Sequence, residues 1–283
     1  MSDPRAGHLV LVTTPIGNAR DITLRALDLL READVLVAED TRSLRRLMDI
    51  HGVPVSGRPL LAYHDHSGPK MRDKVVSHLE AGAHVVYASE AGTPLIADPG
   101  YDLVQVARAA GHGVTAAPGA SAAVTALSLA GLPTDRFFFE GFLPSAKGAR
   151  RKVLQSLVAV PGTLIFYESP KRLEKSLNDM VEILGASRAA VVARELTKRF
   201  EEIRSAPLAE LRDQIAQTPP KGEIVVLVGP APEVEVSPEA ITRMLTEALA
   251  TQSAKDAVAE VTAATGAPRR QVYREALAIL GKS

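Results

Sequence analysis

The side chains that could do chemistry lie in short stretches at the ends of apolar runs. Five of them follow a predicted strand or lie in a glycine-rich turn: Asp40, His64, His66, Thr93 and Ser121. Carboxylates and imidazoles are common general acids and bases. If the apolar runs are parallel strands, their carboxyl ends meet at one edge of a sheet, so we expect these side chains to face a common edge.

The turn signals are densest at 89–100, "SEAGTPLIADPG", between an apolar run at 84–88 and a helical pattern at 102–110. Gly92 and Gly100 have no side chain that would keep a bound molecule away from the backbone. The stretch therefore predicts a ligand loop whose backbone amides approach the ligand. A tight strand-to-helix connection without a ligand is the alternative that this stretch alone leaves open.

Several familiar site motifs are absent from the sequence. The first apolar run ends in "TTPIGN" rather than "GxGxxG", and neither "GxxxxGK[ST]" nor "GxSxG" occurs. A dinucleotide fingerprint, a P-loop and a hydrolase elbow are thereby excluded. His64 and His66 would point the same way on a strand, but no spacing fixes a third ligand, so we expect no metal site. A ligand without phosphate, held mainly by backbone groups, fits these turns better.

Composition limits the class of protein. The chain has 283 residues, of which 46% are hydrophobic, with 33 Lys+Arg and 33 Asp+Glu. This length favours two domains, and net neutrality argues against bulk non-specific nucleic-acid binding while it allows a local basic face. The absence of cysteine excludes disulfides and favours the cytoplasm. No run approaches the ~20 apolar residues of a spanning helix, so we expect no membrane contact.

The order of apolar runs and helical patterns predicts an α/β fold with two α/β domains. In residues 1–119 strands alternate with helices five times, which favours a parallel sheet with helices on both faces. Residues 120–230 predict a second α/β domain with a mixed sheet, and residues 237–283 predict a helical extension after a proline-rich linker. The extension is either a helix-turn-helix or a cap packed on the second domain.

A series of motifs resembles, in order and spacing, the small-subunit ribosomal RNA methyltransferases of the tetrapyrrole methylase superfamily. The motifs lie between residues 9 and 229 and include "TPIGNARDITLRAL", "SEAGTPLIADPG", "FYESPKRL" and "ARELTKRFEE". The resemblance implies a cleft between two α/β domains that binds S-adenosylmethionine. It also implies methylation of a cytidine 2′-hydroxyl in the decoding region of 16S ribosomal RNA, within the small ribosomal subunit, by a homodimer.

The resemblance also assigns residues, motif by motif. The implied cofactor contacts are Pro15, Ile16, Gly17, Gly92, Thr93, Pro94, Ile96, Ser121, Ala122, Leu196 and Gly222. For the methyl transfer itself, Asp40 and His66 are the candidate general bases, and Lys198 is a candidate electrostatic aid. The chain departs from the family pattern at Glu90, where an aspartate is usual, so a role that needs the shorter carboxylate is in question.

Two other functions stay open. A C-methylase of the same superfamily would bind the same cofactor and a tetrapyrrole, although the first loop here is "TPIGN" rather than a "GxGxGD"-like sequence. A regulator could sense a metabolite with its α/β domains and bind nucleic acid with its tail. If RNA is the partner, the basic stretch 147–152 is the predicted contact, and Arg269, Arg270 and Arg274 are the alternative.

Overall fold

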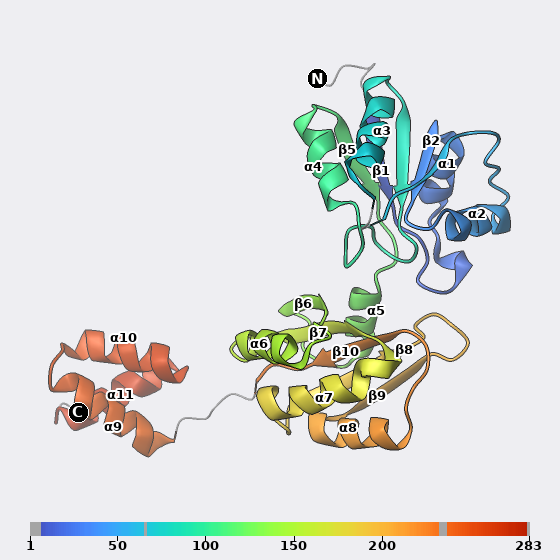
Figure 1. The fold of residues 1–283 in the computed structure, drawn as a ribbon. Coiled ribbons are helices and arrows are strands. Elements are labelled where there is room, and N and C mark those ends of the chain that lie inside the picture. The colour runs from blue at the N-terminus through green and yellow to red at the C-terminus, as the bar shows by residue number, and fades with distance from the viewer. Residues whose placement is uncertain (1–6, 65–66, 232–236, 282–283) are drawn as a thin grey trace. The chain divides into compact units, whose positions relative to one another are not determined.

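The structure, a computed structural model, describes residues 7–64, 67–231 and 237–281. The chain divides into two compact units, Met1–Ala231 and Pro232–Ser283 (Figure 1). The first unit contains two five-stranded sheets. Because both sheets belong to one unit, the predicted division between residues 119 and 120 stays a prediction.

The first sheet has the strand order β3-β2-β4-β1-β5, and all of its neighbours are parallel. The strands are β1 (His8–Val12), β2 (Val35–Ala38), β3 (Leu60–Ala62), β4 (His84–Ala88) and β5 (Gly113–Ala117). Four helices connect them: α1 (Leu24–Glu32), α2 (Thr41–Ile50), α3 (Pro69–Glu80) and α4 (Tyr101–Ala109), with a short 3-10 turn η1 (Ala19–Asp21) before α1.

Two apolar cores lie on opposite faces of this sheet. In one, Leu30 of α1 and Met48 of α2 pack on Val10 and its neighbours. In the other, helices α3 and α4 pack on the alternate side chains, such as Tyr87. Figure 1 shows these helix pairs on the two sides of the sheet. The predicted doubly wound parallel sheet is confirmed, because strands buried on both faces require near-continuous apolar sequence.

The second sheet is mixed, as predicted, with the order β6-β7-β10-β8-β9. β6 and β7 are parallel, and the other neighbours are antiparallel. The strands are β6 (Phe137–Phe142), β7 (Thr163–Glu168), β8 (Ala189–Arg194), β9 (Glu202–Pro207) and β10 (Ile224–Val228). The helices are α5 (Ala122–Leu129) on one face and α6 (Lys147–Leu157), α7 (Pro170–Leu184) and α8 (Leu208–Gln217) on the other. Helix α8 was not predicted, although Leu208, Leu211 and Ile215 have helical spacing and are buried.

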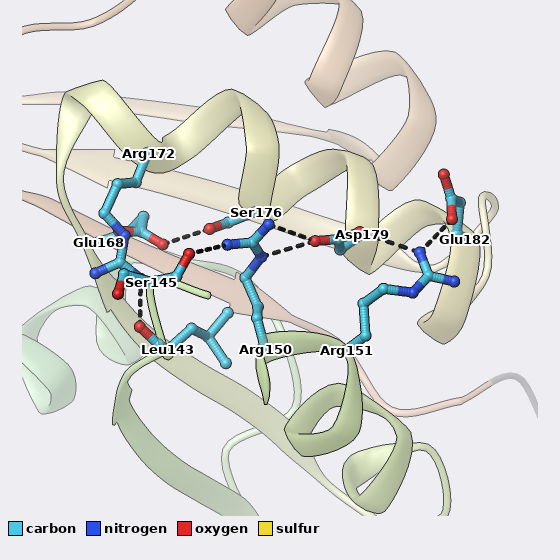
Figure 2. Close-up of polar contacts among 9 residues, drawn as sticks. All are labelled: Leu143, Ser145, Arg150, Arg151, Glu168, Arg172, Ser176, Asp179 and Glu182. Atoms are coloured by element: carbon cyan, nitrogen blue, oxygen red, sulfur yellow. Dashed lines mark hydrogen bonds and ion pairs between the residues drawn. The ribbon is translucent and has the colours of Figure 1, made fainter. Parts of the chain in front are cut away.

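Arginines of α6 are bound to acidic residues of α7 (Figure 2). Arg150 is buried, and its Nη2 lies 2.6 Å from Asp179 Oδ2, while Arg151 Nη1 lies 3.0 Å from Asp179 Oδ1. Arg151 also pairs with Glu182. The prediction that Arg150 contacts RNA is therefore wrong, because a buried guanidinium with a buried carboxylate partner has no surface to offer a phosphate.

The second unit is a small three-helix group with its own core. Its helices are α9 (Pro238–Leu249), α10 (Ala254–Thr265) and α11 (Arg269–Ile279). Ser237 and Ser253 accept hydrogen bonds from the first turns of α9 and α10, and Gly266 ends α10 with φ 68°. Leu245, Val258 and Val272, one from each helix, are buried together. Caps and apolar spacing thus specify the three predicted helices.

Candidate active site

The loops at the carboxyl ends of β1, β2 and β4 surround a cavity of about 930 Å³, and residues of β7, β8 and β10 close it from the second sheet. This volume lies near the upper end of the ~300–1,000 Å³ that small-molecule sites span. The cavity lies outside the carboxyl ends of the parallel strands, where open α/β sheets bind ligands.

Two loops from different sheets meet at this cavity. The backbone N–H of Asn18 donates to Thr197 Oγ1 at 3.1 Å. A Cβ atom on Gly17 would lie 2.5 Å from Lys198 Cγ and 2.7 Å from Thr197 Oγ1. Glycine is required at position 17 because any side chain there would separate the two loops.

Backbone strain is concentrated in the loops that line the cavity. Among the described residues, five non-glycine residues have positive φ, and four of them lie in the segments 95–97 and 195–197: Leu95, Ala97, Glu195 and Thr197. Such left-handed conformations cost roughly 1–3 kcal/mol each and cluster at ligand sites. The surrounding contacts hold these backbones in one geometry, which favours a preorganised site.

The two glycines of the 89–100 loop make close contacts within the protein. The Gly92 N–H donates to the Thr14 carbonyl at 3.1 Å, so this amide is already used. A Cβ atom on Gly100 would lie 2.8 Å from the ring of Tyr87. The expectation that the Gly92 amide approaches a ligand is therefore wrong, although Gly92 does line the cavity. The expectation for the Gly100 amide stays a prediction.

Lys198 forms a charged cluster at the cavity wall. Its Nζ lies 3.1 Å from Glu195 Oε1 and 2.8 Å from Glu223 Oε2. Burial favours the neutral amine, but the hydrogen bonds to Glu223 and Glu195 prevail and raise the pKa of Lys198. The backbone N–H of Glu223, and then Lys198, lower the pKa of Glu195. Lys198 therefore carries a fixed positive charge at neutral pH.

The cavity fits S-adenosylmethionine, the cofactor that the resemblance implies. Its apolar lining suits an adenine ring and includes Ile16, Ala122, Ala193, Leu196 and Val225. Ser121 and Ala122 place the amino end of α5 at the cavity, and the Ser121 hydroxyl makes no capping hydrogen bond within the described chain. The amino end of a helix suits the carboxylate of an amino acid.

The charges on the cavity wall also suit this cofactor. Acidic side chains outnumber basic ones among the lining residues: Glu39, Glu90, Asp98, Glu168 and Glu223 against Arg46 and Lys198. An acidic excess attracts a ligand that carries a sulfonium and an ammonium group.

Ten of the eleven residues predicted to contact the cofactor line this cavity: Pro15, Ile16, Gly17, Gly92, Thr93, Ile96, Ser121, Ala122, Leu196 and Gly222. Pro94 is the exception. Of the candidate catalytic residues, Lys198 lines the cavity. His66 lies outside the described residues. The site assignments stay predictions, since lining a cavity does not establish a contact.

Asp40 has a structural task in this chain. Its carboxylate caps α2 by accepting hydrogen bonds from the backbone N–H groups of Arg42 at 2.7 Å and Ser43 at 3.4 Å. The Arg42 side chain and backbone lower the pKa of Asp40 to about 2. Asp40 is not among the cavity-lining residues, and a carboxylate with so low a pKa is a weak base. The predicted common edge is therefore incomplete, with Thr93 and Ser121 at the cavity and Asp40 beside it.

Sequence reasoning did not select three carboxylates of the cavity, Glu39, Asp98 and Glu223. The Glu90 N–H donates to Glu39 Oε2 at 3.2 Å, and Ser43 Oγ donates to Glu90 Oε1 at 3.4 Å. Glu39 directly follows an apolar strand, which is the signal that selected Asp40 and could have selected its neighbour.

Within the described ranges no group of three or more His, Cys, Asp or Glu residues is arranged to hold a metal ion. His64 belongs to these ranges, whereas Asp65 and His66 do not. No helix of the described chain is long and apolar enough to cross a membrane.

Comparisons with known proteins agree with this geometry. The family model described as Tetrapyrrole (Corrin/Porphyrin) Methylases matches residues 8–212, and the one described as RsmI C-terminal HTH domain matches residues 235–280. A ribosomal RNA small subunit methyltransferase I of Mesorhizobium japonicum is 47% identical, over 97% of this chain and 92% of that protein. The same-named protein of Pseudomonas aeruginosa is 47% identical, over 98% and 99%.

The similar solved structures are more distant. The methyltransferase CobJ has a TM-score of 0.62 at 21% identity, over 82% of this chain and 98% of that one. A uroporphyrin-III C-methyl transferase from Thermus thermophilus, complexed with S-adenyl homocysteine, has a TM-score of 0.56 at 20% identity, over 79% and 97%. Likeness at this identity shows the fold alone.

Proposed function

The chain belongs to the tetrapyrrole methylase family, and within it to the ribosomal RNA small subunit methyltransferase I proteins, and we propose that it methylates a cytidine 2′-hydroxyl of 16S ribosomal RNA with S-adenosylmethionine. The observation that carries this proposal is the acidic, preorganised cavity of about 930 Å³. Its volume has room for the cofactor beside part of a substrate.

The cofactor supplies an activated methyl group, so the protein contributes mainly position. The apolar lining and the amino end of α5 hold the two ends of the cofactor, while the strained segments 95–97 and 195–197 fix the wall between them. Well-oriented reactants reach effective molarities of roughly 10⁵ M or more. Lys198 is held by Glu195 and Glu223, and we keep it as an electrostatic aid.

A general base would add about 10² to 10⁴ to the rate, because a ribose hydroxyl is a poor nucleophile at neutral pH. Asp40 is the weaker of the two predicted bases, since it caps α2 and pairs with Arg42. The assignment of His66 is kept as a proposal on the resemblance alone.

A tetrapyrrole C-methylase is not favoured as the function. The relatives at 47% identity bear the name of an RNA methyltransferase, whereas the solved tetrapyrrole enzymes are about 20% identical and support the fold only.

We further propose that the second unit helps to bind the RNA. The family model for residues 235–280 describes a helix-turn-helix, and Arg269, Arg270 and Arg274 of α11 are exposed. Within the described chain these three arginines form no ion pair, so their charge is available to phosphates. The small ribosomal subunit, rather than free RNA, is the expected substrate on the resemblance.

The homodimer also stays a proposal. Among the described residues, α5 and β6 carry five exposed large apolar side chains: Val124, Leu129, Phe137, Phe138 and Phe142. β6 is an edge strand, and an exposed apolar edge is usually covered by another chain. Light scattering that gives the mass of one 30.1 kDa chain at micromolar concentration would contradict the dimer.

A methyl-transfer assay with labelled cofactor tests the function. The substrates are small ribosomal subunits that lack the modification, the free RNA and a porphyrinoid. We expect label on the 2′-oxygen of one cytidine in the subunits. Transfer to the porphyrinoid alone would support the C-methylase, and no transfer to any substrate would support the regulator.

A further inference from the structure

The loop 195–201 between β8 and β9 continues past the wall of the cavity. Leu196 and Lys198 line the cavity, whereas Arg199 and Phe200 do not. The Cα atoms of Lys198 and Phe200 lie at most about 7 Å apart, because two residues of extended chain span no more. Arg199 and Phe200 therefore lie beside the cavity, outside its lining.

Phe200 presents an aromatic ring to solvent at this place. The residue is 61% exposed, more than any other phenylalanine of the chain. The Arg199 guanidinium carbon lies 5.5 Å from the centre of the ring, a distance typical of a cation–π contact. One exposed apolar residue alone would need no explanation. An exposed ring with a cation against it offers a nucleic acid both a stacking face and a positive charge.

Hydrogen bonds hold the loop that carries this pair. The Thr197 N–H donates to Glu201 Oε2 at 2.6 Å, and the Glu201 N–H donates to the Lys198 carbonyl at 3.2 Å. Thr197 Oγ1 accepts from the Asn18 N–H at 3.1 Å, which ties the loop to the first sheet. Glu195 and Thr197 are fixed with positive φ. Because a surface that is ordered before binding loses less conformational entropy on binding, this loop suits recognition.

The charge of Arg199 is available to a ligand. Arg199 is exposed and forms no ion pair with any described residue, whereas its neighbour Lys198 is paired with Glu195 and Glu223. The wall of the cavity has an acidic excess, which repels the phosphates of a nucleic acid. A backbone that brings a ribose to this wall therefore needs a cation beside it, and Arg199 is placed to provide one.

The ring favours an unpaired nucleotide over a paired one. In an RNA helix the bases stack on one another, and the major groove is too narrow for side chains to read. Unpaired nucleotides can place a base on an aromatic ring. Since Phe200 follows the cavity-lining Lys198 by two residues, the base that it reaches belongs to a nucleotide close to the one in the cavity.

We propose that Arg199 and Phe200 bind an unpaired nucleotide that neighbours the methylated one in the RNA, with its base stacked on Phe200 and its phosphate at Arg199. The inference rests on the proposed function and adds a contact outside the cofactor cavity. By holding the neighbour, the pair sets which ribose of the strand enters the cavity. It takes no part in the methyl transfer itself.

Phe200→Ala tests the stacking face. We expect KM for small subunits that lack the modification to rise about 5- to 150-fold, the effect of losing one stacked base. The rate at saturating subunits and the cofactor affinity by calorimetry should stay those of the wild type, because Phe200 does not line the cavity. Phe200→Tyr keeps the ring and should restore the wild-type KM. Both variants should fold because Phe200 is exposed, and circular dichroism checks this.

Arg199→Ala tests the phosphate contact with the ring in place. We expect the salt slope of subunit binding to fall by about 0.7, the contribution of one phosphate on a single strand. Arg108→Ala is the matched control, because Arg108 is an exposed arginine in the last turn of α4, at the opposite edge of the first sheet from the cavity. Its slope should equal that of the wild type.

An unchanged KM in an active Phe200→Ala variant would overturn the stacking site, as would a KM in Phe200→Tyr as high as in Phe200→Ala. A changed mass of Phe200→Ala in light scattering, with KM unchanged, would assign the ring to a contact between two copies of the chain. An unchanged slope in Arg199→Ala would overturn the phosphate contact. An inactive wild type would instead contradict the proposed function, so the two failures are distinguishable.

Discussion

The arginines of α6 and those of α11 look alike in the sequence, yet the structure places them in opposite situations. The Arg150 side chain is 5% exposed and bound to Asp179, and Arg151 is shared between Asp179 and Glu182. The arginines of α11 are exposed and form no ion pair within the described chain. One cluster is part of the fold and the other is available to a partner, so formal charge does not equal available charge.

Arg150 of α6 and Arg172 of α7 also bind backbone carbonyls close to the cavity. Arg150 Nη1 donates to the Ser145 carbonyl at 3.1 Å, and Arg172 donates to the Leu143 carbonyl. Arg172 lies 3.4 Å from Glu168, which lines the cavity. Figure 2 shows this chain of contacts. The arginines therefore hold the segment that follows Phe142, another lining residue.

Breaking the buried pair should have the largest effect. Asp179→Ala leaves Arg150 buried without its carboxylate, which we expect to lower the free energy of unfolding by about 3–5 kcal/mol. Urea denaturation measures this value. Asp213→Ala, which removes the exposed partner of Arg212, is the control and should cost less than about 1 kcal/mol. Equal losses would contradict a structural role for the α6 cluster.

Removing the exposed arginines of α11 should weaken binding to the small subunit without changing the stability of the protein. We expect Arg269→Ala, Arg270→Ala and Arg274→Ala together to lower the salt slope of subunit binding by up to about 2 to 3, since each phosphate contact contributes roughly 0.7–0.9. Binding at two or more salt concentrations measures the slope.

The matched variant combines Lys147→Ala with Lys152→Ala, which removes the exposed charges of α6. We expect its slope to equal that of the wild type. A larger loss in this variant than in the α11 variant would return the RNA contact to α6.

Arg151 is intermediate between the buried Arg150 and the exposed arginines of α11, because its side chain is 36% exposed. Solvent screens such a pair, so we expect Arg151→Ala to destabilise the protein by about 1 kcal/mol or less. Urea denaturation beside Asp179→Ala measures the difference. A loss as large as that of Asp179→Ala would mean that Arg151, and not Arg150, holds the carboxylate.

The smallest effect concerns Asp40 and Arg42, an exposed ion pair at the start of α2. Because the folded pKa of Asp40 is lowered from 3.8 to about 2, its contribution to stability is present above pH 3.8 and is lost as the pH falls through 2. In Arg42→Ala the pKa of Asp40 should rise toward its ordinary value, as measured by NMR titration. An unchanged titration would assign the low pKa to the backbone N–H groups alone.

The parts that the sequence predicts well are those with local causes. Strands such as β1 and β10 are near-continuous apolar runs, and Ser237, Ser253 and Gly266 identify helix ends by residue type alone. The cavity followed from strand ends in a parallel sheet. Lys198 was predicted through the resemblance only. The segment 195–197, which precedes it, has left-handed backbone at Glu195 and Thr197, and no residue type in that segment requires this conformation.

Two of the misses have non-local causes. Arg150 is buried beside its partner Asp179, which lies 29 residues further along the chain. No spacing within α6 reveals this partner, so the sequence of α6 alone does not predict the burial. The Gly92 N–H was expected to face a ligand, but it donates to Thr14, a residue of a distant segment that the local sequence does not reveal. Asp40 could have been predicted as a helix cap, since aspartate is a preferred N-cap residue.

The excess of carboxylates on the cavity wall has a consequence for turnover. Methyl transfer converts the positively charged sulfonium into a neutral thioether, so the spent cofactor carries one positive charge less than the one that entered. Glu39, Glu90 and Glu223 attract the charged form more strongly than the neutral one. The wall therefore favours exchange of spent for fresh cofactor after each transfer, and mutations that neutralise it should slow multiple turnover more than the first.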